Sequence, residues 1–533
     1  MRSGRRRVRV ALLAALAAAV ALAAPACRDR KATSPGTEPA AGRATPEEDA
    51  VPAPGRGAPV VSIRVVFDVG AVDDPAGKEG LAALTAALVA GGGSRDASYS
   101  AVQERLYPIG GTIRGWADQE TTTFAAEAPA EHAAELYAVL RGLVVTPRFD
   151  AGDFDRVRAA QVAALAGTLR GADDEQLARR ALELLIFENH RYAHLPEGTV
   201  RSLLSLAPDD ARGFHRERYR AGNARFGVAG AYPAELPDAI RADLAALPPG
   251  VPEREPVLAA SPAGLPEVVI VEKPAPAASI ALGFPVGVNR AHPDFAALLV
   301  GISWLGEHRT PYGRLYRELR EARGLNYGDY AYAEHFVEQP GTRFHAPGHP
   351  RSQQYVSLWI RPVAPANAAF ALRTALAELD RAIADGIPRE EFERQRDFLR
   401  QYVQLWRQTP DRRLGWELDD HFYGTPDGLA QLDARLAALT PETLQAALVR
   451  HLRADRWKAV VVTQDAELLR QQLTAGLPTP VAPAEGEGPG TGEIPEADRR
   501  YAAWPLGLVR ASVFVVPAQA LFETAAPPWR ARP

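Results

Sequence analysis

The chain has 533 residues, which is enough for two or three domains that each bury a core. Its residues are 47% hydrophobic and 24% charged, a globular balance that excludes a disordered or membrane-embedded chain. The formal net charge is -4 at pH 7 and becomes more negative if the arginine-rich N-terminus is removed, which argues against nucleic acid as the main partner.

The N-terminus has the pattern of an export signal. Arginines near the start are followed by an apolar run from Val10 to Ala24, which is short for a membrane span. Small residues at 24–26 suit a signal peptidase, and the single cysteine of the chain, Cys27, comes next. We therefore predict a signal peptide at 1–26 and a lipid anchor on Cys27, as in a bacterial envelope lipoprotein on the periplasmic side or at the outer membrane. A plain secretory signal cut after Ala26 is the alternative.

The first domain is expected to follow a tether. Residues 27–59 are rich in Ala, Pro, Gly, Thr and charges without apolar periodicity, which predicts a flexible segment. The β-branched run from Val60 to Phe67 predicts a strand. An Ala/Leu helix is expected from Gly80 to Ala90, because three glycines at 91–93 end it. We place this domain at residues 60–247.

Two segments repeat the same order of signals, which indicates an internal duplication. After Pro147, an acidic-Phe-acidic-Arg pattern occurs at 153–156, and after Pro388 it returns at 391–394. Each copy then has a proline-led helix, at Pro208 and at Pro441, before a strand at 226–229 or 459–462. The sequence therefore predicts an α+β fold of two similar halves.

Two stretches without a core pattern separate and end these halves. Residues 248–266 are loaded with Pro, Glu and Ala and predict a linker, so the second domain is expected at 267–478. Residues 479–533 contain a Gly/Glu/Pro spacer and then strand-like hydrophobic residues from Trp504 to Phe522. We expect this last segment to dock on the body.

Short motifs in the first half have the order and spacing found in the pitrilysin/insulinase zinc peptidases. They are Val69-Gly70, Gly80-Leu81-Ala82, Leu106 with Gly110-Gly111, Pro196-Glu197-Gly198, and the strand end Gly227 to Gly230. The resemblance runs through nearly the whole body. It implies that each half is an antiparallel sheet with helices packed on one face, and that the two halves together form one half of a clam-shell chamber for peptides.

The residues that bind zinc in that family are missing. There, Gly-Leu-Ala is followed by His-x-x-Glu-His on a helix, which supplies two zinc ligands and a general base. Here Ala83 and Ala87 stand at the histidine positions and Ala86 at the glutamate position. The expected region of the third ligand, residues 161–164, has no carboxylate. We predict that this chain binds no zinc or other cofactor and is inactive as a peptidase on its own.

Two other histidine pairs have the four-residue spacing of a zinc-binding helix. His190 and His194 lie where the family has a loop, with an arginine in place of the base. A proline and a glycine lie between His345 and His349 and disfavour one helical face. We predict exposed or hydrogen-bonded loop histidines at both places. An independent enzyme built on His190, His194 and a distant carboxylate is the alternative.

The second half keeps the signature that carries chemistry. The segments Gly313-Arg314-Leu315-Tyr316, Leu319-Arg320-Glu321 and Gly324-Leu325-Asn326-Tyr327 resemble the second-half signature of the same family. In that family an arginine and a tyrosine seven residues apart hydrogen-bond the backbone of the bound peptide, and Arg320 with Tyr327 match these positions. The resemblance implies a substrate-binding pair that can hold a carbonyl but cannot activate water. The alternative is a local ion pair of Arg320 with Glu318 or Glu321.

The resemblance also implies a subunit role. In the short-chain bacterial branch of the family, one polypeptide carries the zinc motif and another carries the Arg/Tyr pair. We therefore predict a non-catalytic, substrate-binding subunit of a heteromeric zinc peptidase, whose partner is a homologous chain with zinc and whose substrate is a peptide. The alternative is a non-enzymatic peptide-binding or scaffold lipoprotein of the cell envelope.

Overall fold

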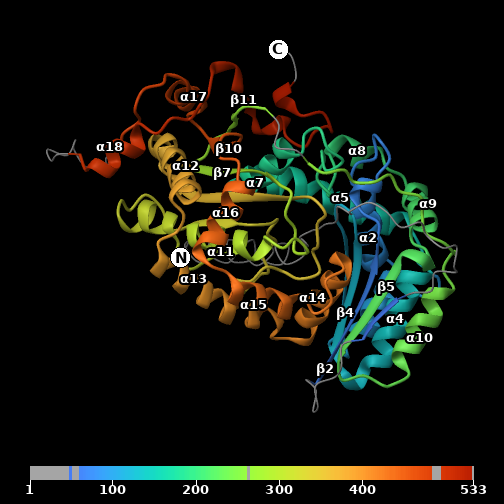
Figure 1. Cartoon of the computed structure of the whole chain (residues 1–533). Coiled ribbons are helices and arrows are strands. Elements are labelled where there is room, and N and C mark those ends of the chain that lie inside the picture. The colour runs from blue at the N-terminus through green and yellow to red at the C-terminus, as the bar shows by residue number, and fades with distance from the viewer. Residues whose placement is uncertain (1–46, 51–58, 261–263, 483–493, 531–533) are drawn as a thin grey trace, which may run out of the picture.

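The computed structural model describes residues 47–50, 59–260, 264–482 and 494–530, which form two sheets covered by helices (Figure 1). The predicted signal peptide, Cys27 and most of the predicted tether lie outside the described residues. Within the part of the chain that is described, no helix is both long and apolar enough to cross a membrane.

The first sheet has five strands in the order β1-β5-β2-β4-β3. The strands are β1 (Glu47–Ala50), β2 (Val60–Phe67), β3 (Thr112–Ala117), β4 (Thr122–Pro129) and β5 (Ala224–Gly230). β2 pairs antiparallel with both β4 and β5, and β3 pairs antiparallel with β4. The strand predicted from Val60 to Phe67 is confirmed as β2, and the strand predicted at 226–229 lies within β5.

Strand β1 corrects part of the predicted tether. Four residues inside the range 27–59, Glu47–Ala50, form a strand that pairs in parallel with β5. Without this strand β5 would be the open edge of the sheet, and its outer N–H and C=O groups would lack partners. The sequence does not reveal β1, because four residues are too few to display an apolar alternation.

Helices of the first half cover one face of this sheet. α2 (Leu81–Gly91), α4 (Ala133–Val145) and α10 (Leu236–Ala245) contact its strands, and Ile63 and Val65 of β2 lie in the same core. The helix predicted from Gly80 to Ala90 is confirmed as α2. The other helices of this half are α3 (Tyr99–Leu106), α5 (Ala151–Ala163), π-helix η3 (Ala164–Leu169), α6 (Arg170–Ala172), α7 (Asp174–Ile186), α8 (Val200–Ser205) and α9 (Pro208–Arg218).

The second sheet has six strands in the order β11-β6-β10-β7-β9-β8. The strands are β6 (Glu267–Glu272), β7 (Ala278–Val286), β8 (Asp329–Tyr332), β9 (Gln354–Val363), β10 (Lys458–Thr463) and β11 (Val513–Pro517). The helices of this half are α11 (Phe295–Leu305), π-helix η5 (Tyr316–Glu321), α12 (Ala368–Asp385), α13 (Arg389–Tyr402), α14 (Pro410–Tyr423), α15 (Gly428–Ala438), α16 (Pro441–His451), α17 (Ala466–Thr474) and α18 (Glu496–Ala502).

Both sheets are mixed, which corrects the expectation of antiparallel sheets. The pairs β1 with β5, β6 with β10, and β6 with β11 are parallel. A parallel pair needs a long crossover connection, and each of these pairs joins strands that are far apart in the sequence. The sequence marks individual strands but contains no local signal for such distant pairings.

Each sheet receives a helix from the opposite half on its second face. α14 contacts β2 and β5 of the first sheet, where Leu414 and Leu418 pack against Val66 and Ala229. α7 contacts β7 and β10 of the second sheet, as Figure 1 shows, and its buried residues share a core with Val460 and others of that sheet. Helices of each half therefore cover one face of its own sheet, as predicted. α7 and α14 are the exceptions, because each packs on the sheet of the other half and so joins the two halves.

The repeated signals correspond to equivalent elements in the two halves. The acidic-Phe-acidic-Arg patterns lie in α5 and α13, where Phe154 and Phe392 are buried. Thr440 caps α16 and accepts a hydrogen bond from the backbone N–H of Thr443, with a proline at the first helical position. α9 and α16 lead to β5 and β10 respectively. The α+β fold with two similar halves is confirmed.

The C-terminal segment contacts both halves. β11 extends the second sheet beside β6, and the backbone N–H of Val200 in the first half donates to the carbonyl of Phe522 at 2.9 Å. The guanidinium of Arg530 pairs with Glu188 of the first half and with Glu267 of the second. This segment therefore fastens the two halves at a third place, besides α7 and α14.

Candidate functional site

Four arginines recur every three residues in the segment that carries Arg320. Arg314 pairs with Glu378 and Glu318, and Arg323 pairs with Asp498 and Glu318. Arg317 pairs with Glu391. Arg320 is the one of these four that has no carboxylate partner among the described residues, so the local ion pair with Glu318 or Glu321 does not form.

Arg320 instead lies against Tyr327. Its guanidinium carbon is 5.4 Å from the centroid of the tyrosine ring, within the range of a cation–π contact. Tyr327 is 82% exposed, although it stands in a segment whose neighbours Asn326 and Asp329 are buried. Arg320 belongs to the π-helix η5, and such single-turn widenings are frequent at functional sites. The structure thus brings the two predicted residues together and leaves both able to meet a ligand.

The motif positions on α2 of the first half are occupied by three alanines, whose side chains cannot bind zinc. Ala86 of α2 is fully buried, and Ala83 and Ala87 pack against the first core. The helix lies close to β3, because a Cβ on Gly115 of that strand would come within 2.6 Å of the carbonyl oxygen of Ala86. Methyl groups have no donor atom for a metal, so the residues present here do not fit the zinc ion of the related peptidases.

The region expected to supply the third ligand serves a structural role. Gln161 of α5 lies beside the start of α2, where its Nε2 donates to the carbonyls of Gly80 at 3.3 Å and Glu197 at 2.9 Å. Its side-chain amide is therefore occupied by backbone. The adjacent π-helix η3 begins at Ala164, which also has no ligand atom in its side chain.

The two histidine pairs lie in loops, and three of the four histidines contact backbone groups. His190 Nδ1 accepts from the N–H of Tyr192 at 3.1 Å, and His194 Nδ1 lies 3.0 Å from the carbonyl of Leu195. Burial lowers the pKa of both imidazoles. His345 Nδ1 accepts from the N–H of Val337 at 3.1 Å. The contacts of His190, His194 and His345 agree with hydrogen-bonded loop histidines. His349 differs from this prediction, because it is buried and its Nδ1 has no hydrogen-bond partner among the described residues.

A further cluster has metal-ligand residue types but is occupied by arginine. His292, Asp294 and His451 place ligand atoms within 4.8 Å of one another. However, His292 Nδ1 already accepts from the N–H of Asp294, and Arg450 pairs with the carboxylate of Asp294 at 2.5 Å. A guanidinium on the only acidic ligand repels a second cation, so we assign no metal to this cluster.

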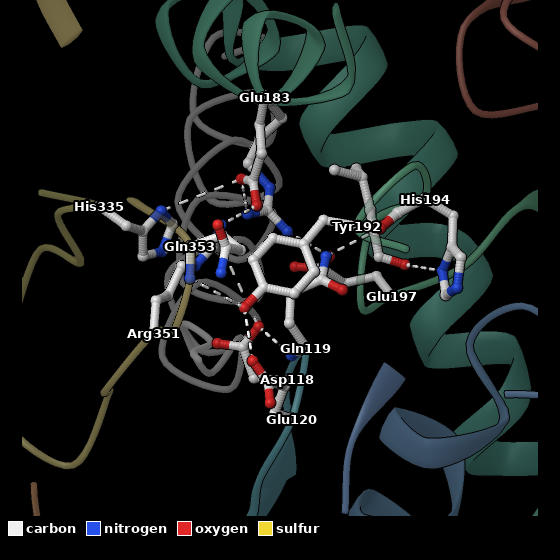
Figure 2. Close-up of polar contacts among 12 residues, drawn as sticks. Asp118, Gln119, Glu120, Glu183, Tyr192, His194, Glu197, His335, Arg351 and Gln353 are labelled. Atoms are coloured by element: carbon white, nitrogen blue, oxygen red, sulfur yellow. Dashed lines mark hydrogen bonds and ion pairs between the residues drawn. The ribbon is translucent and has the colours of Figure 1, made fainter. Parts of the chain in front are cut away.

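A buried polar network joins the two halves (Figure 2). Arg351 of the second half donates to Glu183 of α7 at 2.5 Å, and both side chains are almost fully buried. Tyr192 donates to Glu120 at 2.6 Å and lies 3.3 Å from Ser352. Sequence reasoning missed this network, because Arg351 and Glu183 are 168 residues apart and no local spacing links them.

Models of two domains of one peptidase family match the chain. The model described as insulinase (peptidase family M16) matches residues 55–189, and the model described as peptidase M16 inactive domain matches residues 205–399. The chain belongs to the M16 (insulinase) peptidase family. The resemblance inferred from the motifs is thereby confirmed, and the M16 inactive-domain model covers the segment with Arg320 and Tyr327.

Solved structures share the M16 fold. A peptidase M16 inactive domain from Pseudomonas fluorescens is 21% identical with a TM-score of 0.65, over 78% of this chain and 94% of that chain. A protease from Helicobacter pylori is 14% identical with a TM-score of 0.64, over 78% and 96% of the two chains. A chain of Complex III2 from Candida albicans is 15% identical with a TM-score of 0.60, over 79% and 94%. No curated protein sequence matches the chain.

Proposed function

We propose that this M16 chain is the non-catalytic, peptide-binding subunit of a two-chain zinc peptidase. Zinc and the general base belong to a homologous partner chain, and this chain contributes Arg320 and Tyr327. The observation that carries the proposal is that Arg320 has no carboxylate partner among the described residues. Three neighbouring arginines are neutralised by carboxylates, whereas Arg320 has no such partner in the part of the chain that the structure describes and lies against the exposed ring of Tyr327.

The chemistry of this pair suits a peptide carbonyl. A guanidinium offers several N–H donors in a planar fork, and a phenol offers one O–H donor. Both can donate to a carbonyl oxygen and to the negative charge that develops on it during attack by water. Neither can activate that water at neutral pH, so this chain depends on the partner for the reaction itself.

A second feature supports an extended peptide as the substrate. β3 forms one end of the first sheet, and no strand among the described residues pairs with its outer edge. Thr112 and Arg114 of this strand are exposed. An open strand edge accepts an extended peptide through backbone hydrogen bonds.

The proposed location is the bacterial cell envelope. The N-terminal arginines, apolar run and Cys27 support export followed by lipid attachment, and they favour a position on the outer side of the inner membrane or at the outer membrane. An envelope location exposes the subunit to extracytoplasmic peptides. Replacement of Cys27 by alanine is expected to move the protein from the membrane fraction to the soluble extract.

The test uses the complex co-expressed with its zinc-bearing partner. Arg320→Ala is expected to lower kcat/KM for peptide cleavage about 100-fold, and Tyr327→Phe about tenfold, because each removes a donor to the reacting carbonyl. Arg317→Ala is the matched control, since it removes an equal charge from the same helix but one already paired with Glu391. Undiminished activity in both site variants contradicts the proposal and favours a peptide-binding or scaffold lipoprotein.

A further inference from the structure

The turn that presents Tyr327 contains two buried polar residues. Gly324 adopts a φ of 65°, and the chain then enters β8 at Asp329. Asn326 is 4% exposed and Asp329 is fully buried, while Tyr327 between them is 82% exposed. Something must therefore hold the two flanking residues inside while the tyrosine projects outward.

The side chains of these two residues meet. Asn326 Nδ2 donates to Asp329 Oδ1 at 2.7 Å and to the carbonyl of Arg361 at 3.2 Å. The other two oxygens, Asn326 Oδ1 and Asp329 Oδ2, have no hydrogen bond of good geometry among the described residues. Two buried acceptor oxygens that lack a donor of good geometry are costly, and side chains of this kind rarely leave both unsatisfied.

One proton resolves both deficits. If Asp329 is a carboxylic acid, its Oδ2–H can donate to Asn326 Oδ1 while Asn326 Nδ2 donates to Asp329 Oδ1. A carboxylic acid and a primary amide are matched for this two-point contact, because each supplies one donor and one acceptor. An ionised Asp329 supplies acceptors alone and cannot satisfy the amide oxygen.

The surroundings favour the protonated form. Burial raises the pKa of Asp329 to about 8, although Asn326 and the backbone and charge of Arg361 act in the opposite direction. The guanidinium of Arg361 pairs with Glu175 of α7 at 3.0 Å, which reduces its influence on Asp329. Tyr330 on the same strand is the other ionisable group beside Arg361.

We propose that Asp329 is a positioning residue, held as a neutral acid in a two-point pair with Asn326, and that this pair fixes the turn that sets Tyr327 against Arg320. The pair spans Tyr327 and Gly328, so it determines where the phenol projects. The inference rests on the proposed peptide-binding role of Tyr327, but the pairing itself is a property of this chain alone.

The experiment compares Asp329→Asn with Asp329→Ala and has two readouts. The first is the thermal unfolding midpoint between pH 6 and pH 9. Asp329→Asn is expected to keep a midpoint close to wild type at pH 6 and to lose less on going to pH 9, because an amide preserves the two-point contact and cannot ionise. A midpoint that falls equally in wild type and Asp329→Asn contradicts the neutral-acid pair.

The second readout is the affinity for fluorescein-labelled casein peptides, measured by anisotropy. Asp329→Ala is expected to weaken binding about tenfold, the ordinary cost of losing such a contact, and Asp329→Asn is expected to restore it. Wild-type binding should weaken as pH rises above about 8, and Asp329→Asn binding should not.

The two readouts separate two kinds of failure. If wild type binds no peptide but the unfolding midpoints behave as expected, the proposed peptide role fails and the acid–amide pair stands. If peptide binds but Asp329→Asn behaves like Asp329→Ala at every pH, the positioning role is overturned. Asn326→Ala provides a second route to the same comparison if Asp329→Ala does not fold.

Discussion

The surface of α2 in the first half and the segment of η5 in the second half differ in the chemistry that their side chains offer. On α2 the metal positions are alanines, and the helix packs closely against β3 at Gly115. On η5 an arginine that pairs with no carboxylate of the described residues lies beside an exposed tyrosine. The fold persists without the metal site, because packing and not a metal holds α2 in place.

The largest expected effect comes from removing a buried ion pair that joins the two halves. Arg351→Ala leaves Glu183 as a buried charge without its closest partner and should lower the free energy of unfolding by about 3–5 kcal/mol. Urea denaturation measures this change. Arg394→Ala, which removes an exposed partner of Glu390, should change it by less than about 1 kcal/mol. Equal effects of the two substitutions would show that the network in Figure 2 does not hold the halves together.

Restoring the glutamate of the zinc motif tests whether α2 still has room for a charged side chain at that position. Ala86→Glu places a charged side chain at a fully buried position and should destabilise the protein by about 2–4 kcal/mol without adding peptidase activity. Ala160→Glu on the exposed face of α5 is the control and should stay within about 0.5 kcal/mol. A stable Ala86→Glu variant would mean that α2 has kept room for the missing base.

The pH dependence of stability tests the second half. Burial raises the pKa of Asp329 to about 8 and that of Glu307 to about 7, so the folded state keeps protons that the unfolded chain releases near pH 4. This stability is fully present below about pH 4 and is lost as pH rises through 7 to 8. The unfolding midpoint should therefore fall by a few degrees between pH 6 and pH 9, and Glu307→Gln should flatten the curve. A midpoint that is constant over this range would contradict the burial of these groups.

The smallest expected effect is the change in the stability of the protein when Arg320 or Tyr327 is replaced. Arg320→Ala and Tyr327→Phe should each change the free energy of unfolding by less than about 0.5 kcal/mol, because Tyr327 is exposed and Arg320 makes no ion pair within the described ranges. Chemical denaturation measures the free energy of unfolding, and the activity assay measures peptide cleavage on the same samples. A large loss of stability would give the pair a structural role in place of a binding role.

Much of the fold follows from local sequence signals. β2 was predictable because a β-branched run is bounded by a proline and a glycine turn, and α2 because glycines stand at both of its ends. The packing of α7 and α14 on the opposite sheets was not predictable, because an apolar helix face does not specify which sheet it covers. The same holds for β1 and for the parallel pairings.

The residues of the candidate site also differ in whether the sequence alone reveals them. Arg320 and Tyr327 could be found because the signature around them is continuous in the sequence. Asn326 belongs to that signature and Asp329 lies two residues beyond its end, but the sequence alone does not show that their side chains meet. The pairing of Arg351 with Glu183 depends on the relative placement of two distant elements, and no motif in the chain reports it.

The central claim is that this chain binds peptide but supplies no metal chemistry. The most direct measurement is zinc content and peptide cleavage for the chain purified alone and for the complex isolated with it from the native membrane fraction. The account predicts no stoichiometric zinc and no cleavage for the lone chain, and both for a complex that contains a homologous chain with a His-x-x-Glu-His motif. Stoichiometric zinc and cleavage in the lone chain would contradict it.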